Sequence, residues 1–432
     1  MPYQFIHMLT SLALILGCAV LGGKLARLIK LPTITGFLIA GMLTGPYVFE
    51  LLSHQDLASL QLLDHAALGF IALMAGSELE MKTLKTRLGS ITGVMLGLVT
   101  VTASIGLGTI YLLGDWLSFL KGTSSETHLA AALLAGVIMT ARSPSAAIAV
   151  IGEMKAQGPF TQLILGVTVL MDAVVIMLFA IAITAAHSLV SEHALSILFL
   201  AEIGVELILS IGLGILIGLM ILGIFKTKLV MFRMQWLLLC PIGVMALADQ
   251  LHHLSLGELP VHIEPLLTCL VTGVTFNLAN EETHPHIDQG LASSSPAIYL
   301  VFFTLTGASL ALDQLWLIWP AAGIVFLVRL IGICGGATLG GMFVGEPAHQ
   351  HKIRWMGFVT QAGVGLGLSQ RVAEEFPTWG IGFATMMTAV IVMNECLGPI
   401  FFKRALVLSG EGQSTTNDPL EEADVIGLES SH

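Results

Sequence analysis

A single charged residue interrupts one of the long apolar stretches of this chain. Asp172 is the only formally charged side chain between Gln157 and Ser191. It lies near the middle of an apolar run from Leu163 to Thr184, which is long enough to cross a bilayer, since a spanning helix needs about 20 residues. The carboxyl group is therefore predicted to lie near the membrane midplane, where an ionisable side chain is costly and rarely serves packing alone.

A carboxyl group at that depth has a definite chemistry. Low-dielectric surroundings favour its protonated form, so the group can hold either a proton or a small cation. Competition between these two occupants is the simplest chemistry by which one site could exchange them. The alternative is a structural carboxylate paired inside the protein. We interpret Asp172 as the functional centre.

The composition places most of the chain in lipid. Of 432 residues, 55% are hydrophobic and only 11% are charged, against about 25% charged residues in aqueous domains. The sequence contains no nucleophile–base pair, phosphate-binding loop or zinc-ligand spacing. It therefore predicts neither an enzyme nor a cofactor, and no nucleic-acid partner.

Hydropathy predicts an all-α polytopic membrane protein with about thirteen transmembrane helices. The polar, acidic residues 409–432 are predicted to form a disordered cytoplasmic tail after a membrane domain of residues 1–408. The predicted spans are approximately 4–23, 32–50, 62–79, 90–113, 128–152, 160–187, 203–225, 232–250, 262–280, 295–310, 316–343, 354–373 and 381–402.

The basic residues support this number of crossings. With the N-terminus outside and the C-terminus in the cytoplasm, fourteen of the eighteen lysines and arginines fall on cytoplasmic connections. Such an asymmetry follows the positive-inside rule, and a missed or additional helix would scramble it. We expect a multi-pass protein of a bacterial inner membrane.

Two predicted helices are interrupted at corresponding places in the two halves of the chain. The first contains Pro144 within Thr140–Ser145, where proline removes a backbone donor and disfavours helix at the preceding residue. The second contains Gly363, Gly365 and Gly367. Paired interruptions of this kind indicate a transport site built on an inverted repeat. An ordinary proline kink is the alternative for Pro144.

Unwound backbone at membrane depth persists only where it lines a cavity or is buried in protein. The hydroxyl groups of Thr140, Ser143 and Ser145 are hard oxygen ligands, suited to a small cation beside Asp172.

These features resemble the monovalent cation:proton antiporter-2 family, which includes bacterial sodium/proton and potassium/proton exchangers. The resemblance covers about residues 10–406 and depends on the order and spacing of several segments. They are residues 36–47, 68–82, 143–152, 167–177, 302–313 and 394–407, together with Arg329.

The resemblance implies a homodimer that exchanges Na⁺ or K⁺ for protons across the bilayer and contributes to pH homeostasis. It implies two crossed broken helices and an elevator-like movement of a core domain, about residues 62–187 and 295–402. The scaffold domain would comprise about residues 4–50 and 203–280. By this resemblance Asp172 carries the proton and the cation alternately.

The sequence departs from the family pattern at Met171, where a polar or second acidic residue often precedes the transport aspartate. Met171 favours electroneutral exchange and leaves Arg329 without its usual acid, for which Glu395 and Glu78 are candidates. Arg142 lies unexpectedly within the first interruption. It would act either as a tethered occupant of the empty cation site or as an interfacial, snorkelling arginine.

Two other functions stay open at this stage. One is a sodium-coupled symporter of a small organic solute, which would need a polar or aromatic pocket, although the chain has only four tyrosines. The other is a non-transporting membrane sensor or a channel. A sensor usually carries a soluble output domain and a channel a repeated pore loop, and we find neither motif in the sequence.

Overall fold

The fold is helical almost throughout. The computed structural model describes residues 2–78, 81–191, 197–225, 233–251, 255–256, 259–260, 263–279, 284–309, 312–361 and 363–412. Glu78, a predicted partner of Arg329, ends a described helix, but its side chain is not among those the structure describes.

The described residues of the first half form seven helices and one short 3₁₀ turn, η1 (Gly114–Trp116). Two of these helices, α5 and α6, together make up the first interrupted segment. The helices are α1 (Pro2–Leu28), α2 (Thr33–Thr44), α3 (His54–Glu78), α4 (Met81–Leu113), α5 (Ser125–Ile138), α6 (Pro144–Met154) and α7 (Pro159–Ser191).

Where the second half is described, it contains eight helices and an antiparallel pair of two-residue strands, β1 (Ser255–Leu256) with β2 (Leu259–Pro260). The 3₁₀ turns η3 (Phe276–Leu278) and η4 (Trp355–Phe358) extend α10 and α13. The helices are α8 (Ile197–Phe225), α9 (Arg233–Leu251), α10 (Pro265–Thr275), α11 (His284–Ser309), α12 (Leu312–Phe343), α13 (Ala348–Arg354), α14 (Gly363–Glu375) and α15 (Gly380–Leu408).

Within the described residues, 7 helices are long and apolar enough to cross a membrane. Several shorter apolar helices, among them α5, α6 and α10, lie between them. Large hydrophobic side chains such as Ile208, Leu216 and Met220 on α8 are exposed, as expected of a surface that faces lipid. The count of thirteen crossings stays a prediction.

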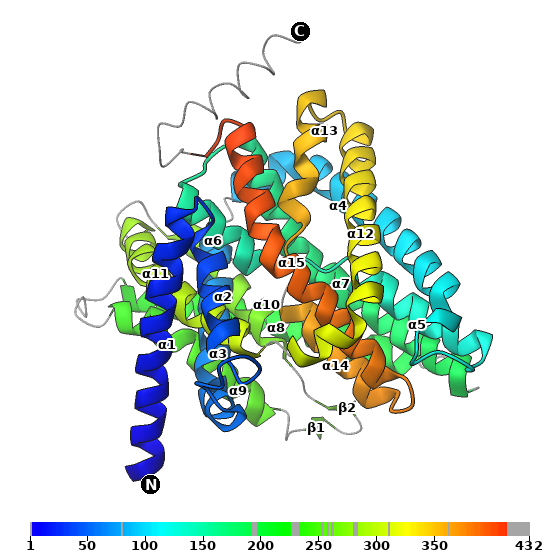
Figure 1. Cartoon of the computed structure of the whole chain (residues 1–432). Coiled ribbons are helices and arrows are strands. Elements are labelled where there is room, and N and C mark those ends of the chain that lie inside the picture. Colours follow the sequence, from blue (N-terminus) through cyan, green and yellow to red (C-terminus); the bar gives the residue numbers. More distant parts are fainter. Residues whose placement is uncertain are drawn as a thin grey trace.

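The helices pack in two groups (Figure 1). In the first, which we call the scaffold group, α1 and α11 pack against α2, and α3 packs against α10, α11 and α9, while α8 covers α10. In the second, the core group, α4 lies along α12 and α5, α7 lies along α5, and α15 packs against α12 and α14. Contacts between the groups are sparse and involve mainly α6, α7 and α15 with α2, α3 and α8.

This grouping differs from the expected domain boundaries at two helices. The predicted core included α3 and α11, but both pack mainly against helices of the scaffold group. Hydropathy marks where a helix is, and neither of these helices carries a sequence signal for its neighbours. Packing partners are decided by side-chain shape in three dimensions.

Two glycine-mediated crossings in the scaffold group show the internal repeat. A Cβ atom on Gly41 of α2 would collide with the Thr304 carbonyl of α11, and one on Gly76 of α3 would collide with the Leu270 carbonyl of α10. In an order in which each interrupted helix counts once, α2 and α3 of the first half correspond to α10 and α11 of the second. The pair α2–α11 therefore maps onto α10–α3. In the chain α2 is followed by α3, and α10 by α11. The two crossings therefore occupy equivalent places in the two halves, as an internal repeat requires.

Hydrogen bonds near helix ends bring basic residues together at one end of the molecule. Lys403 Nζ donates to the Lys30 carbonyl (3.1 Å), and Arg87 Nη1 donates to the Pro159 carbonyl (3.1 Å). Figure 1 shows this end, where α15 finishes, opposite the N-terminus. These contacts agree with the grouping of lysines and arginines that the thirteen-segment topology requires. Which side of the membrane this end faces stays a prediction.

The first residues after α15 are ordered, which differs from the expectation of disorder from Ser409 onward. Glu411 accepts hydrogen bonds from the backbone N–H groups of Phe160 and Thr161 and from the Thr161 hydroxyl, all at 2.7 Å. The first N–H groups of a helix lack partners within it, so a carboxylate there caps the helix and complements its dipole. Glu411 thus caps α7 from the far end of the chain. Residues 413–432 of the predicted tail lie outside the described residues.

We expect Glu411→Ala to lower the free energy of unfolding by about 1–2 kcal/mol, because N-cap losses cost roughly that much. Denaturation of the purified protein in detergent would measure the change. Glu374→Ala is the matched control, since Glu374 is exposed on α14. Equal stability of the two variants would show that Glu411 contributes nothing to α7.

Candidate functional site

The two helix interruptions meet inside the core group. Between α5 and α6 the chain is non-helical, and Ser143 caps α6 by accepting a hydrogen bond from the Ala146 N–H (3.2 Å). The second interruption separates η4 from α14. The Ser143 N–H donates to the Thr360 carbonyl across the two interruptions (3.2 Å). The predicted crossing of two broken helices is therefore present, with Pro144 as the first residue of α6.

The second interruption lies earlier than the glycine pattern predicts. Gly363 is the first residue of α14, and Gly365 and Gly367 lie inside that helix. The non-helical residues are Val359, Thr360 and Gln361. Glycine lowers helix propensity by only about 1 kcal/mol, whereas the carbonyl groups of Val359 and Thr360 have hydrogen-bond partners outside their own helix. These partners fix the position of the interruption.

Arg329 of α12 joins the two interruptions. Its side chain is fully buried and donates to the Met139 carbonyl (3.0 Å) and the Ala141 carbonyl (2.9 Å) of the first interruption. It also donates to the Val359 carbonyl (2.8 Å) of the second interruption and to Asn394 Oδ1 on α15. Unwound carbonyl groups at membrane depth need such partners, and the planar fork of arginine can reach several of them at once.

The acid expected beside Arg329 is not its hydrogen-bond partner. Asn394, the neighbour of the predicted Glu395, occupies that place. The Asn394 amide also donates to Gln361 Oε1 (3.2 Å), and Gln361 Nε2 donates to the Ile138 carbonyl (2.8 Å). Glu395 is buried within reach of the Arg329 charge, and its Oε1 atom has no hydrogen-bond partner among the described residues. The sequence analysis missed Asn394 and Gln361, because a lone amide in an apolar helix carries no motif.

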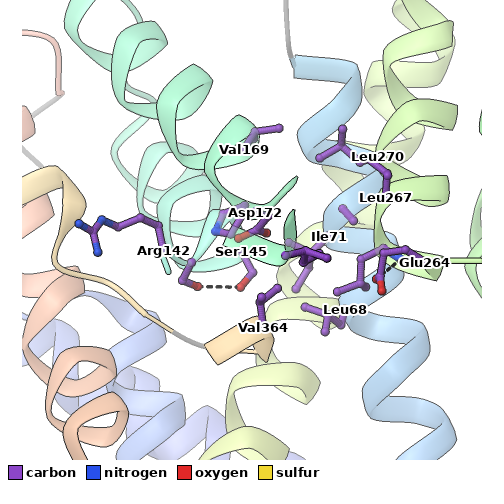
Figure 2. Close-up of a pocket in the computed structure, with 15 residues that line it drawn as sticks. Leu68, Ile71, Arg142, Ser145, Val169, Asp172, Glu264, Leu267, Leu270 and Val364 are labelled. Carbon is purple, nitrogen blue, oxygen red and sulfur yellow. Dashed lines mark hydrogen bonds between the residues drawn. The ribbon is translucent and has the colours of Figure 1, made fainter. Parts of the chain in front are cut away.

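Asp172 faces a cavity between the two packing groups (Figure 2). The cavity has about 70 Å³ of space that the centre of a water molecule can reach, and it opens to the exterior. On the core side it is lined by Asp172 and Val169 of α7, by the first interruption and by Val364 of α14. On the scaffold side it is lined by α3 and α10. The Oδ1 atom of Asp172 is buried and has no hydrogen-bond partner among the described residues.

Two of the three predicted hydroxyl ligands line this cavity. Ser143 and Ser145 both do so, and their hydroxyl groups are hydrogen-bonded to each other (3.0 Å). Figure 2 shows Ser145 beside Asp172. Thr140 does not line the cavity, and its hydroxyl donates to the Val137 carbonyl in the last turn of α5 (2.7 Å). A threonine near a helix end readily makes this local bond, which the linear spacing of residues cannot show.

Arg142 is fully buried, at 1% exposure, so the interpretation as an interfacial arginine is wrong. Its Nη1 atom donates to the carbonyl groups of Met139 and Ala141 (3.2 and 3.0 Å). Its Nε and Nη2 atoms are buried without hydrogen-bond partners among the described residues. In Figure 2 the side chain extends away from Asp172, and it does not occupy the cation position as a tethered ligand would.

A second carboxylate, missed by the sequence analysis, lies on the scaffold side of the cavity. Glu264 lines it and caps α10 by accepting a hydrogen bond from the Leu266 N–H (3.1 Å). Its backbone N–H is fixed by the Ser210 hydroxyl of α8 (2.8 Å). A signal was present in the sequence, because Glu264 directly precedes Pro265 at the start of an apolar segment, and proline favours the first position of a helix.

We expect Arg329→Lys to lower the free energy of unfolding by about 3 kcal/mol or more. The lysine keeps the charge but cannot reach the carbonyl groups of both interruptions together, so buried acceptors lose their partners. Denaturant titration in detergent measures the loss, and Arg371→Lys at an exposed site on α14 is the control. Unchanged stability would show that the two interruptions are held by other contacts.

Comparison with known proteins identifies the family. A family model described as the transmembrane sodium/hydrogen exchanger matches residues 12–403. The Na(+)/H(+)-K(+) antiporter GerN of Bacillus cereus is 24% identical over 422 residues, which cover 93% of this chain and 96% of GerN. An uncharacterized protein in the phaC 3′ region of Methylorubrum extorquens is 36% identical over 104 residues, 23% of this chain and 36% of that protein.

Two solved structures of the sodium proton antiporter MjNhaP1 from Methanocaldococcus jannaschii share the fold. Their TM-scores are 0.65 and 0.74, with 17% and 15% sequence identity. The matches cover 94% and 96% of this chain, and 99% and 100% of the MjNhaP1 chains. The family match, the fold and the apolar helices agree, and the chain is an integral, multi-pass membrane transporter that belongs to the sodium/hydrogen exchanger family.

Proposed function

We propose that this protein exchanges Na⁺ or K⁺ for protons, and that the cation and the proton compete for Asp172. The observation that carries the proposal is the state of the Asp172 carboxylate. Its Oδ1 atom is buried without a hydrogen-bond partner among the described residues, and it faces a cavity lined by two serine hydroxyl groups. A carboxylate without a partner at this depth is stabilised when a proton or a cation binds it.

The same residues offer a small cation suitable ligands. The carboxylate of Asp172 and the hydroxyl groups of Ser143 and Ser145 present oxygen atoms, which hard cations prefer. Protonation of Asp172 removes the charge that attracts the cation, so one occupant excludes the other. The remaining walls are mainly leucine, isoleucine, valine and alanine, which offer an organic solute few hydrogen bonds. The symporter alternative is therefore less well supported than cation exchange.

Electroneutral exchange is favoured because Asp172 is the one described carboxylate of the core group that lines the cavity. Met171, next to Asp172, is apolar and fully buried. A cation bound in one direction, and a proton bound in the other, would each neutralise the Asp172 carboxylate while the site moves across the membrane. A neutral site crosses the bilayer at lower cost than a charged one.

Alternating access would come from movement of the core group against the scaffold group. Asp172 and both interruptions belong to the core group, whereas the opposite wall of the cavity belongs to the scaffold group, with α3 and α11 included. The sparse contacts between the groups make a sliding movement structurally feasible. The homodimer implied by the family resemblance would then form through the scaffold group.

We expect Asp172→Asn to abolish exchange while the protein still folds and inserts. Asparagine has nearly the same shape as aspartate, but its neutral amide cannot take up a proton or attract a cation as the carboxylate does. The assay uses proteoliposomes with a preset pH gradient and follows its dissipation by Na⁺, Li⁺ or K⁺. Asp115→Asn, at an exposed position in η1, is the control. Cation-dependent dissipation that persists in folded Asp172→Asn contradicts the role of Asp172.

The sliding movement can be tested at one contact between the groups. Glu153 of α6 caps α2 by accepting a hydrogen bond from the Thr33 N–H (2.7 Å). This bond joins core to scaffold and would have to break in each cycle. In a variant without native cysteines, we expect a thiol cross-link between Thr33→Cys and Glu153→Cys to stop exchange, and cleavage of the cross-linker to restore it. Each single-cysteine variant treated with the same reagent is the control, and full exchange by the cross-linked protein would exclude the movement.

A further inference from the structure

Glu264 places a second carboxylate on the opposite wall of the cavity that holds Asp172. Both side chains line this cavity, as does that of Arg142. The two side chains belong to different packing groups, because α10 packs against α3 and α8, while α7 packs against α4 and α5. Figure 2 shows them on opposite sides of the cavity, with Leu68, Leu267 and Ile71 nearby.

The Glu264 side chain is held in place by one of its two carboxylate oxygens, and the other oxygen stays available. Its Oε1 atom accepts the Leu266 N–H, and its backbone is fixed to Ser210. The described residues supply no hydrogen-bond partner and no ion-pair partner for its other oxygen, Oε2. One oxygen of a positioned carboxylate is therefore available to the cavity.

Two carboxylates that line one cavity favour the presence of a cation. Most of the cavity wall is aliphatic, so like charges repel more strongly there than in bulk water, and a cation between the two groups lowers that repulsion. A cation on Asp172 would be attracted by Glu264 as well. The attraction would last only while the core and scaffold groups are placed as they are in this structure.

We propose that Glu264 is a stationary second carboxylate of the cation site, which strengthens cation binding to Asp172 in this conformation alone. The inference rests on the proposed exchange at Asp172 and on movement of the core group. Because Glu264 stays with the scaffold group, it carries no cargo and leaves the stoichiometry unchanged. It makes the affinity for the cation higher at the membrane face to which this conformation opens than at the other face.

The test compares wild type, Asp172→Asn and Glu264→Gln in proteoliposomes with the protein inserted in one orientation. Na⁺ and K⁺ are titrated from each face separately, and the apparent KM and the ratio of protons to cations are measured. Glutamine keeps an Oε1 acceptor for the Leu266 N–H, so the cap of α10 is retained while the charge is lost. Glu50→Gln, which removes an exposed charge from the loop between α2 and α3, is the control.

We expect Glu264→Gln to raise the apparent KM by about 10-fold or more at one face only, as loss of a nearby charge in an apolar cavity predicts. The KM at the other face and the proton-to-cation ratio should match wild type. An unchanged KM at both faces overturns the proposal, and so does an equal rise at both. Loss of exchange at every cation concentration in folded protein also overturns it, since Glu264 would then be a carrier.

If Glu264→Gln does not fold, the pair Glu264→Asp and Glu264→Asn replaces it, because both residues cap helices well and they differ only in charge. A KM at one face that is higher in the asparagine variant than in the aspartate variant supports the proposal, and equal values overturn it. Exchange by the wild-type protein distinguishes failure of the proposed function from failure of the inference about Glu264. Absence of exchange in wild type defeats the proposed function, whereas exchange that depends on Asp172 but not on Glu264 defeats only this inference.

Discussion

The fold depends on one buried guanidinium group. Where two helices unwind inside a membrane protein, their carbonyl groups lose the partners that a continuous helix supplies, and water is not available to replace them. Arg329 donates to Met139 and Ala141 of one interruption and to Val359 of the other. Arg329, Asn394 and Gln361 form one hydrogen-bonded network that connects the two interruptions. This network keeps the first interruption beside Asp172.

The partners of Arg329 are neutral, and this affects the electrostatics of the site. Its hydrogen bonds go to carbonyl and amide oxygens, while Glu395 acts on it only through space. A direct ion pair would cancel both charges locally. Here the guanidinium groups of Arg329 and Arg142 are buried in the core group, and Arg142 lines the same cavity as Asp172 and Glu264. The cavity is therefore lined by charged groups of both signs.

The two cavity carboxylates differ in what holds them. Asp172 projects from the middle of α7, a helix capped at its start by Glu411 and packed against α5. Glu264 is the first polar group of α10 and is tied to α8 through Ser210. Each position is therefore set by a different packing group. The cavity between them is therefore formed by both packing groups.

The sequence by itself determined the class of the protein, the presence of two interrupted helices, and Asp172 as an isolated charge within an apolar helix. Long apolar runs specify helices in lipid, Pro144 interrupts one of them, and Asp172 stands out because no other charge lies near it in the chain. These are properties of consecutive residues. Only the tertiary structure decided that Asn394 and not Glu395 bonds Arg329, that Thr140 turns to its own helix, and that Glu264 faces Asp172. It also moved the second interruption from the glycines to Val359–Gln361 and placed α3 and α11 with the scaffold group. These outcomes depend on contacts between hydrogen-bonding groups and helix surfaces that lie far apart in the sequence, and a local sequence pattern does not specify such contacts.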